Sequence, residues 1–224
     1  MNHDAAKQVT VVVPQEVAGI RIPRTKLAEE ALAFARETMS DVLFNHVLRT
    51  YLFGATQLRQ AGTDYDEEVA FLACLLHDLG LLRQYWTPEG QFEVDGADAA
   101  RSFLATQGLE AEKIDTVWDA IALHTTFGIA LRKQPEISIV CLGSALDFSG
   151  VGFDKMPDGT VDAIISAFPR LGFKKDALET MVDICANKPA GVIMHYFAEV
   201  GRSRVPGFRL PTVEEILFSA PFDE

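Results

Sequence analysis

Apolar residues recur at intervals of three and four along most of this chain, and the alternating pattern of a half-buried strand is scarce. Such intervals bring apolar side chains to one face of an α-helix, which buries that face against other helices. We therefore expect an all-α protein with one domain over residues 1–224, its core at about 24–190, and the segment 191–224 packed on that core or forming a lid. The pattern predicts long helices at residues 24–38, 41–60, 63–80, about 95–107, about 110–125 and about 135–148, and shorter ones at 161–168, 175–187 and 212–220.

Residues of suitable type stand at the ends of these segments. Asp41 is a suitable N-cap, Gly80 a suitable C-cap, and Pro135 fits the first turn of a helix. Residues 149–160 include three glycines and a proline, which predicts a loop, whereas residues 9–14 suit an extended segment.

Composition narrows the choice of partner and compartment. The formal net charge of −12 argues against nucleic acid and against an anionic membrane, because both attract a basic surface. A small neutral or cationic substrate suits this negative net charge better. The protein could also form a homo-oligomer. Three cysteines among apolar residues do not suggest a disulfide framework, and the N-terminus lacks the pattern of a secretory signal. Because the apolar runs are also too short to span a membrane, we expect a reduced, cytoplasmic protein.

The segment Phe71–Leu82, FLACLLHDLGLL, is apolar almost throughout but contains His77 and Asp78 side by side. An ionised carboxylate in apolar surroundings is costly unless it is paired, hydrogen-bonded or bound to a metal. No Lys or Arg lies within one helical turn of Asp78, and Arg83 is the nearest in sequence. A divalent cation held by Asp78 and His77 would remove the cost of burying the carboxylate.

Helical phase places further side chains of this kind on apolar faces. His46, His124 and Asp147 each lie on the apolar face of a different predicted helix, where they can meet His77 and Asp78 in the core. A lone buried histidine more often makes a hydrogen bond than binds a metal, and Asp147, near a helix end, can cap that helix. Imidazole and carboxylate ligands together suit zinc, iron or manganese rather than calcium.

His46, then the adjacent pair His77 and Asp78, then Asp147 resemble the H…HD…D signature of the HD-domain superfamily of metal-dependent hydrolases. The resemblance implies a single HD domain, an all-α fold whose signature residues lie on facing helices. The blocks LFNHVLRTYLFGA, EEVAFLACLLHDLGL, AIALH, SALDFSGVG and FPRLGFKK are similar to the cyanamide hydratase branch of that superfamily, as are IRIPRT and FEVDGADAA. Together these blocks cover roughly residues 20–190.

The resemblance implies a metal site and a reaction. The expected ligands are His46, His77, Asp78 and Asp147, and the expected cofactor is one divalent metal ion, with zinc ahead of iron or manganese. Metal-activated water would hydrate a small nitrile-type substrate, in the first place cyanamide to urea. His124 is the expected proton shuttle, with a fifth metal ligand or a pocket hydrogen bond as the alternatives.

The number of histidines also bears on the metal count. Dinuclear HD proteins place two further histidines between the HD pair and the final aspartate, and this chain has only His124 there. Of the other histidines, His3 belongs to the terminus, and His195 has no acidic companion at helical spacing except Glu199. We therefore expect a mononuclear site.

Four further residues are predicted to contact the substrate: Asn45, Arg49, Thr125 and Phe148. Fungal members of the branch carry glutamine where this chain has Thr125 and asparagine where it has Phe148, so the resemblance implies the fold and the metal more strongly than the substrate. Phe148 and Trp118 could line the pocket, although both also suit ordinary core packing.

Two alternatives to the hydratase stay open. Arg49 either holds a substrate phosphate or pairs with an acidic residue. In the first case, a metal-dependent phosphohydrolase of a nucleotide or other phosphoester is the alternative function. The second alternative is a non-catalytic HD-fold protein that binds a small ligand, with the metal only structural.

Overall fold

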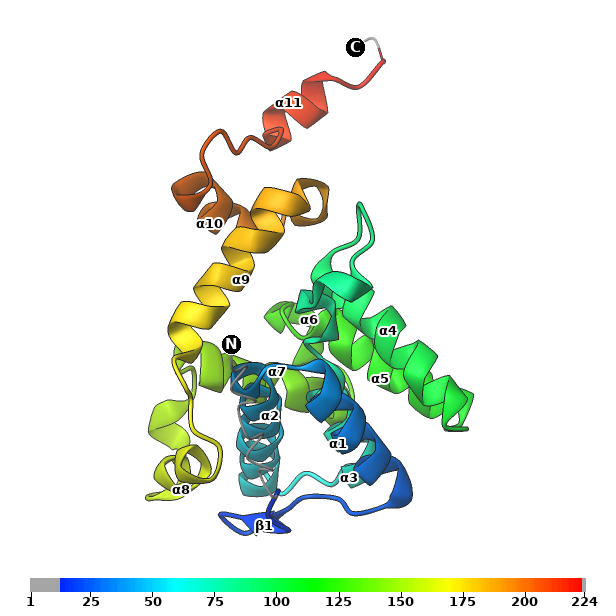
Figure 1. The fold of residues 1–224 in the computed structure, drawn as a ribbon, viewed down its shortest axis with the longest axis vertical. Coiled ribbons are helices and arrows are strands. Elements are labelled where there is room, and N and C mark those ends of the chain that lie inside the picture. The colour runs from blue at the N-terminus through cyan, green and yellow to red at the C-terminus, as the bar shows by residue number, and fades with distance from the viewer. Residues whose placement is uncertain (1–12, 223–224) are drawn as a thin grey trace, which may run out of the picture.

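The computed structural model describes residues 13–222, and these residues form helices apart from one small hairpin (Figure 1). The prediction of an all-α fold is confirmed. In the hairpin, β1 (Glu16–Val17) pairs antiparallel with β2 (Ile20–Arg21), and Val17 lies opposite Ile20. The α-helices are α1 (Lys26–Thr38), α2 (Asp41–Gln60), α3 (Glu67–Leu76), α4 (Phe92–Thr106), α5 (Ala111–Leu123), α6 (Phe127–Ala130), α7 (Pro135–Ser149), α8 (Thr160–Ala167), α9 (Phe173–Asn187), α10 (Phe197–Arg204) and α11 (Val213–Phe218). The 3-10 helices are η1 (Leu79–Leu81), η2 (Arg83–Tyr85), η3 (Phe153–Lys155) and η4 (Pro189–Val192).

Each predicted helix has a counterpart among these elements, although α3 is four residues shorter at each end than the predicted 63–80. Two end residues need comment. Ser40 rather than Asp41 caps α2: its hydroxyl accepts a hydrogen bond from the backbone N–H of Leu43, and Asp41 begins the helix. Pro135 begins α7 as expected. The hairpin, α6 and α10 were not predicted, because their segments are short and lack a clear apolar period. The predicted extended segment at 9–14 lies almost wholly outside the described residues.

The centre of the fold is the pair α2 and α7. Helix α2 is buried on every side over most of its length, so neighbouring helices surround it. Glycines allow its close approach to α7: a Cβ on Gly143 would lie 1.9 Å from the carbonyl oxygen of Thr50, and one on Gly54 would lie 2.4 Å from that of Ile139. This contact sets α2 and α7 side by side, so that the side chains of His46 and Asp147 meet.

The end of α3 differs from the prediction, which continued the helix to Gly80. Helix α3 ends at Leu76, His77 is its C-cap, and Asp78 lies between α3 and η1. The chain turns there because Gly80 packs against the backbone of α4, where an added Cβ would lie 1.8 Å from the carbonyl oxygen of Phe92. Asp78 is therefore on a turn beyond the helix end rather than in mid-helix.

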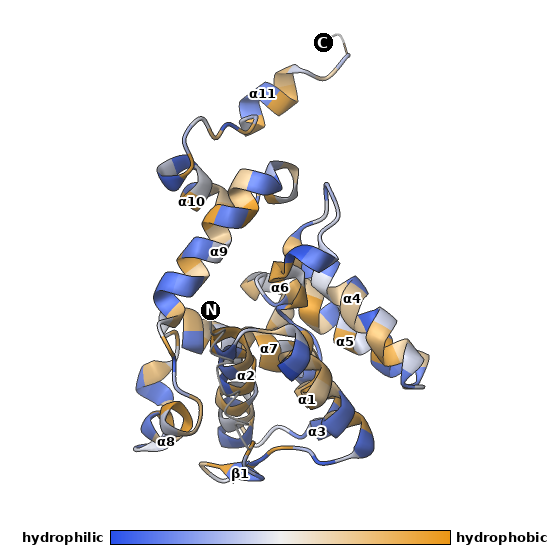
Figure 2. Ribbon diagram, viewed as in Figure 1, coloured by the Kyte–Doolittle hydropathy of each residue, from blue (hydrophilic) through white to orange (hydrophobic). Residues whose placement is uncertain are grey.

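The C-terminal segment packs on the rest of the fold over part of its length. Val192 and Phe197 are buried in a small apolar cluster with Phe92 of α4 and with Met181 and Ile184 of α9. Beyond this cluster, α11 leads away from the other helices (Figure 1) and includes hydrophobic residues (Figure 2). Its apolar residues Val213, Ile216, Leu217 and Phe218 are exposed. Among the described residues, no helix is both long and apolar enough to cross a membrane.

Candidate metal centre

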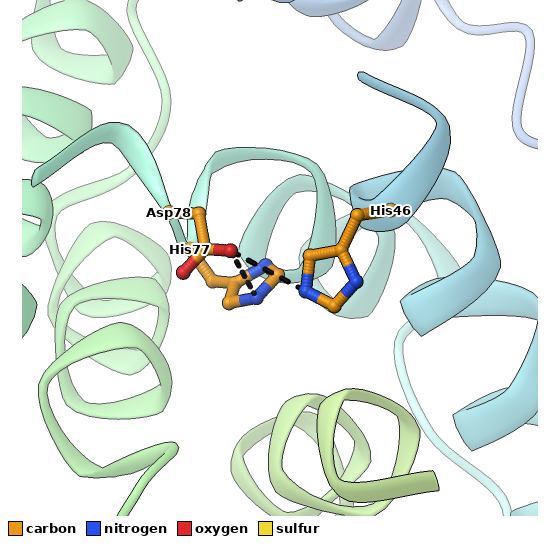
Figure 3. A group of neighbouring side chains, drawn as sticks. All are labelled: His46, His77 and Asp78. Carbon is orange, nitrogen blue, oxygen red and sulfur yellow. Dashed lines mark ion pairs between the residues drawn. The ribbon is translucent and has the colours of Figure 1, made fainter. Parts of the chain in front are cut away.

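Three buried side chains face one another at the ends of α2 and α3. Nε2 of His46 and Nε2 of His77 both lie 3.3 Å from Oδ2 of Asp78 (Figure 3). One ligand atom from each residue lies within 4.8 Å of the other two, which is a spacing that one metal ion can bridge. The sequence predicted all three residues as ligands.

Helix ends fix the orientation of two imidazoles. His77 is the C-cap of α3, and its Nδ1 donates a hydrogen bond to the carbonyl oxygen of Cys74 at 2.8 Å. His124 is the C-cap of α5, and its Nδ1 donates in the same way to Ile121 at 2.7 Å. Both carbonyls belong to the last turn of their helix, and that of Ile121 also accepts the backbone N–H of His124 at 3.4 Å. Both rings consequently present Nε2, with its lone pair, away from the helix.

His46 is oriented by Asp147 of α7. Its Nδ1 donates to Oδ2 of Asp147 at 2.7 Å, so its Nε2 also points to Asp78. Asp147 further accepts hydrogen bonds from Nε and Nη2 of Arg49, at 2.9 and 2.8 Å, and from Arg170 at 2.7 Å. Asp147 is thus on the far side of the His46 ring and is not in the group of possible ligands around Asp78.

The three imidazoles converge on Asp78. Nε2 of His124 lies 3.8 Å from Oδ1 of Asp78, slightly farther away than the corresponding atoms of His46 and His77. Histidines that bind metals donate their other ring N–H to a carbonyl or carboxylate, which fixes the tautomer and the direction of the lone pair. All three rings have this arrangement. Nitrogen and carboxylate donors suit zinc, iron or manganese, so the residues fit the divalent metal that the resemblance implies.

The charges of His77 and Asp78 favour ligation, whereas a proton on His46 competes with it. Burial lowers the pKa of His77 to about 3, so its imidazole is neutral and has a free lone pair at physiological pH. Burial alone would raise the pKa of Asp78, but the neighbouring imidazoles of His77 and His46 outweigh it and lower the pKa. Burial also opposes protonation of His46, but its hydrogen bonds to Asp147 and Asp78 raise the pKa above the ordinary value. The centre therefore combines an ionised carboxylate with one imidazole that readily takes a positive charge.

A cavity of about 560 Å³ opens beside these residues. His46, His77, Asp78 and His124 line it, as does the predicted substrate residue Thr125. Phe148 also lines it, with 47% of its surface exposed. No Lys or Arg is among the described residues that line this cavity.

Two predicted substrate residues, together with Trp118, lie elsewhere. Arg49 is fully buried and donates to Asp147 and to the carbonyl oxygens of Phe168 and Pro169. Of its two predicted roles, the structure therefore shows pairing with an acidic residue. Asn45 donates to the carbonyl oxygen of Pro169 at 2.8 Å. Trp118 donates to Asp98 and does not line the cavity.

The structure adds residues that sequence reasoning missed. His195 donates from Nε2 to Oε1 of Glu93 at 2.9 Å, and Glu93 also accepts from the hydroxyl of Thr125. Glu93 and His195 are 102 positions apart, so helical spacing could not have paired them. Among the described residues, the second carboxylate oxygen of Glu93 has no hydrogen-bond partner. This pair attaches the C-terminal segment to α4 and places Tyr196 in the cavity wall.

The backbone next to His195 is strained. Met194 has a φ of 58°, a left-handed conformation that is uncommon for a residue with a side chain. Such a conformation persists only where the surroundings hold it. Here they include the hydrogen bond to Glu93 and the contact of the His195 ring with that of Phe92, at 5.7 Å between centroids.

Comparison with known proteins agrees with this geometry. The sequence profile of the HD domain family matches residues 43–149, a range that includes His46, His77, Asp78, His124 and Asp147. Residues 43–149 are thus similar to an HD domain. It is also 28% identical to the cyanamide hydratases DDI2 and DDI3 of Saccharomyces cerevisiae, over 75% of this chain and 77% of each yeast protein. These matches confirm the predicted resemblance to the HD-domain superfamily and to cyanamide hydratases.

Proposed function

We propose that this protein is a metal-dependent hydratase that adds water to a small nitrile-type substrate, in the first place cyanamide, and gives urea. The observation that carries the proposal is the convergence of three imidazole Nε2 atoms on the ionised carboxylate of Asp78. The similarity to two yeast proteins named cyanamide hydratase supports the choice of reaction.

The metal is proposed to be one divalent ion, with zinc first. Nε2 of His46, Nε2 of His77 and the Asp78 carboxylate would hold it and leave positions for water and substrate. When bound there, such an ion lowers the pKa of a water molecule toward neutrality and polarises an unsaturated carbon–nitrogen group.

Asp147 is proposed to orient His46 rather than to bind the metal. Its carboxylate accepts hydrogen bonds from His46, Arg49 and Arg170, and coordination would break several of them. The cost would be large because Arg49 is fully buried and would lose its counter-charge. In its present position Asp147 fixes the tautomer of His46 and makes Nε2 of that ring a stronger ligand for a metal ion.

His124 is proposed to move the proton, and Thr125 is proposed to orient the substrate. Nδ1 of His124 is occupied by the backbone of α5, so Nε2 is the atom that takes a proton from water and returns it to the substrate nitrogen. Thr125 lies next to it in the cavity and can orient the substrate, although its hydroxyl hydrogen is engaged by Glu93. The hydroxyl oxygen keeps a lone pair that can accept from a substrate N–H.

The lining of the cavity disfavours a phosphoester substrate. Phosphate recognition relies on Arg, Lys or grouped backbone N–H donors, and no Lys or Arg is among the described lining residues. Arg49, the residue that suggested a phosphate, is engaged by Asp147. A neutral substrate fits this electrostatic environment better.

The test is urea formation from cyanamide by the zinc-loaded protein, beside the variant Asp78→Ala. We expect turnover in the wild type and a loss of at least about 1,000-fold in the variant, as for removal of a group on which the reaction depends. Phosphatase activity with manganese but no urea would favour the phosphohydrolase. Bound metal without turnover on nitriles or phosphoesters would favour the binding protein, and either result would contradict the proposal.

A further inference from the structure

The cavity is much larger than cyanamide. A molecule of three heavy atoms fills on the order of 90 Å³ if each atom takes the ~30 Å³ that a water molecule occupies in the liquid. The cavity measures about 560 Å³, which is in the range of pockets that enclose substantially larger ligands. Cyanamide alone would leave most of this space to water.

The surplus space is lined by apolar side chains. On α9, Phe173, Ala177 and Met181 are four residues apart and therefore form one stripe along the helix, and all three line the cavity. Phe148, at the end of α7, and Phe127, in α6, line it too, with 47% and 44% of their surfaces exposed. Large aromatic side chains exposed in a cavity are a common sign of a binding site for an apolar group.

Four polar residues of the cavity wall form the metal centre, and Ser40, Ser144, Ser149, Asp176 and Thr180 are further polar residues of the lining. His46, His77, Asp78 and His124 lie together, with Thr125 and the hydroxyl-bearing Tyr196 near them. The cavity thus has a reactive polar region and an apolar region, and a ligand that fits both has a small polar group attached to an apolar body.

We propose that the substrate is a nitrile-type compound with an apolar substituent, such as an N-alkyl cyanamide or an alkyl nitrile. The inference rests on the proposed hydration and deepens it. The carbon–nitrogen group lies at His46, His77 and Asp78, and the substituent lies against the α9 stripe and Phe148. Each methylene that leaves water for such a surface tightens binding about fourfold. A butyl group therefore improves binding by about 10- to 100-fold, since the open side of the cavity leaves part of the chain in water.

The first experiment compares cyanamide with N-methylcyanamide and N-butylcyanamide on the zinc-loaded protein. We expect kcat/KM to rise with chain length and to be at least 10-fold higher for the butyl compound than for cyanamide. Equal values within twofold, or a fall with chain length, would overturn the inference while leaving the hydration reaction in place.

A binding measurement separates this inference from the reaction itself. Calorimetry on the zinc-loaded protein compares N-butylurea with urea, neither of which needs turnover to bind. We expect N-butylurea to bind at least 10-fold more tightly. If this preference is found but no nitrile is hydrated, the proposed reaction fails and the apolar site remains for a different polar head group. If it is absent, the apolar site is refuted whatever the activity.

Two variants locate the apolar region. Phe148→Ala and Ala177→Phe are expected to reduce the ratio of N-butylurea to urea affinity by about 10-fold, the first by removing a wall and the second by filling the space. The matched control is Phe153→Ala, because Phe153 is a similarly exposed phenylalanine that does not line this cavity. An unchanged ratio in both variants, or an equal loss in the control, would contradict the proposed location.

Discussion

The variant Asp147→Asn tests whether this aspartate holds the fold or the metal. Both Asp147 and Arg49 have side chains with no exposed surface, and the carboxylate accepts from Nε and Nη2 of the arginine. Asparagine keeps the shape of the side chain but removes the charge that balances Arg49. Removing one partner of a buried ion pair costs about 3–5 kcal/mol, because the other charge stays buried. We expect the low end of that range, since Nη1 of Arg49 keeps the carbonyl oxygens of Phe168 and Pro169 as acceptors.

A loss of about 3 kcal/mol is measurable in a chain of this size. It corresponds to a fall in Tm of roughly 6–12 °C at 2–4 °C per kcal/mol, the value for domains of 150–250 residues. The assay is urea and thermal denaturation of the metal-free protein in the presence of a chelator. The comparison is Asp78→Asn, which removes a buried carboxylate without stranding an arginine. We expect its metal-free stability to be within about 1 kcal/mol of the wild type, with the stabilisation by zinc lost.

The pH dependence of the stability also tests the role of Asp147. Burial alone would raise the pKa of Asp147, but hydrogen bonds from His46 and Arg49 lower it below the ordinary value. A carboxyl group whose pKa is lowered by folding stabilises the protein at any pH above its unfolded-state pKa of about 3.9. This stabilisation is lost as the pH falls from the unfolded-state pKa to the lower folded-state pKa. The variant should therefore lose less stability on acidification than the wild type. If Asp147→Asn keeps its metal-free stability and instead loses zinc, Asp147 is a ligand, as the sequence predicted, and our assignment is refuted.

Three further predictions concern the groups around the metal. His124→Gln should lower kcat for urea formation by about 100- to 10,000-fold and leave one zinc per chain, whereas loss of zinc would make His124 a ligand. Zinc affinity should rise with pH through the raised pKa of His46, because the metal must displace the proton from that ring. Competition titrations from pH 5.5 to 8 measure this affinity, and an affinity independent of pH would contradict the prediction. His195→Phe keeps an aromatic ring but loses the hydrogen bond to Glu93. Hydrogen exchange at residues 193–198 should therefore accelerate while exchange in α2 stays the same. Unchanged exchange at 193–198 would show that the pair of Glu93 and His195 does not hold this segment in place.

The sequence predicts much of this fold because helices leave a local signal. The apolar spacing and residues such as Pro135 predict α7 nearly to the residue. The end of α3 was placed too late because it depends on a tertiary contact, the packing of Gly80 against α4. No local pattern reveals where two backbones will touch.

The candidate site, like the fold, could be predicted from the sequence only in part. His46, His77 and Asp78 were predicted from their apolar surroundings and from the resemblance, and the structure brings them together. For Arg49 the sequence left two alternatives, which only the position of Asp147 on the neighbouring helix distinguishes. The pairing of Glu93 with His195 could not be predicted, because it joins elements far apart in the chain without any shared period.

The most direct measurement is a zinc titration of the chelator-treated protein, with urea formation from cyanamide or its N-butyl derivative followed at each addition. We predict no activity without metal, a linear rise with added zinc, and saturation at one zinc per chain, with no rise at all in Asp78→Ala. Turnover by the metal-free protein, saturation at two equivalents, or an active Asp78→Ala would contradict a mononuclear centre built on Asp78.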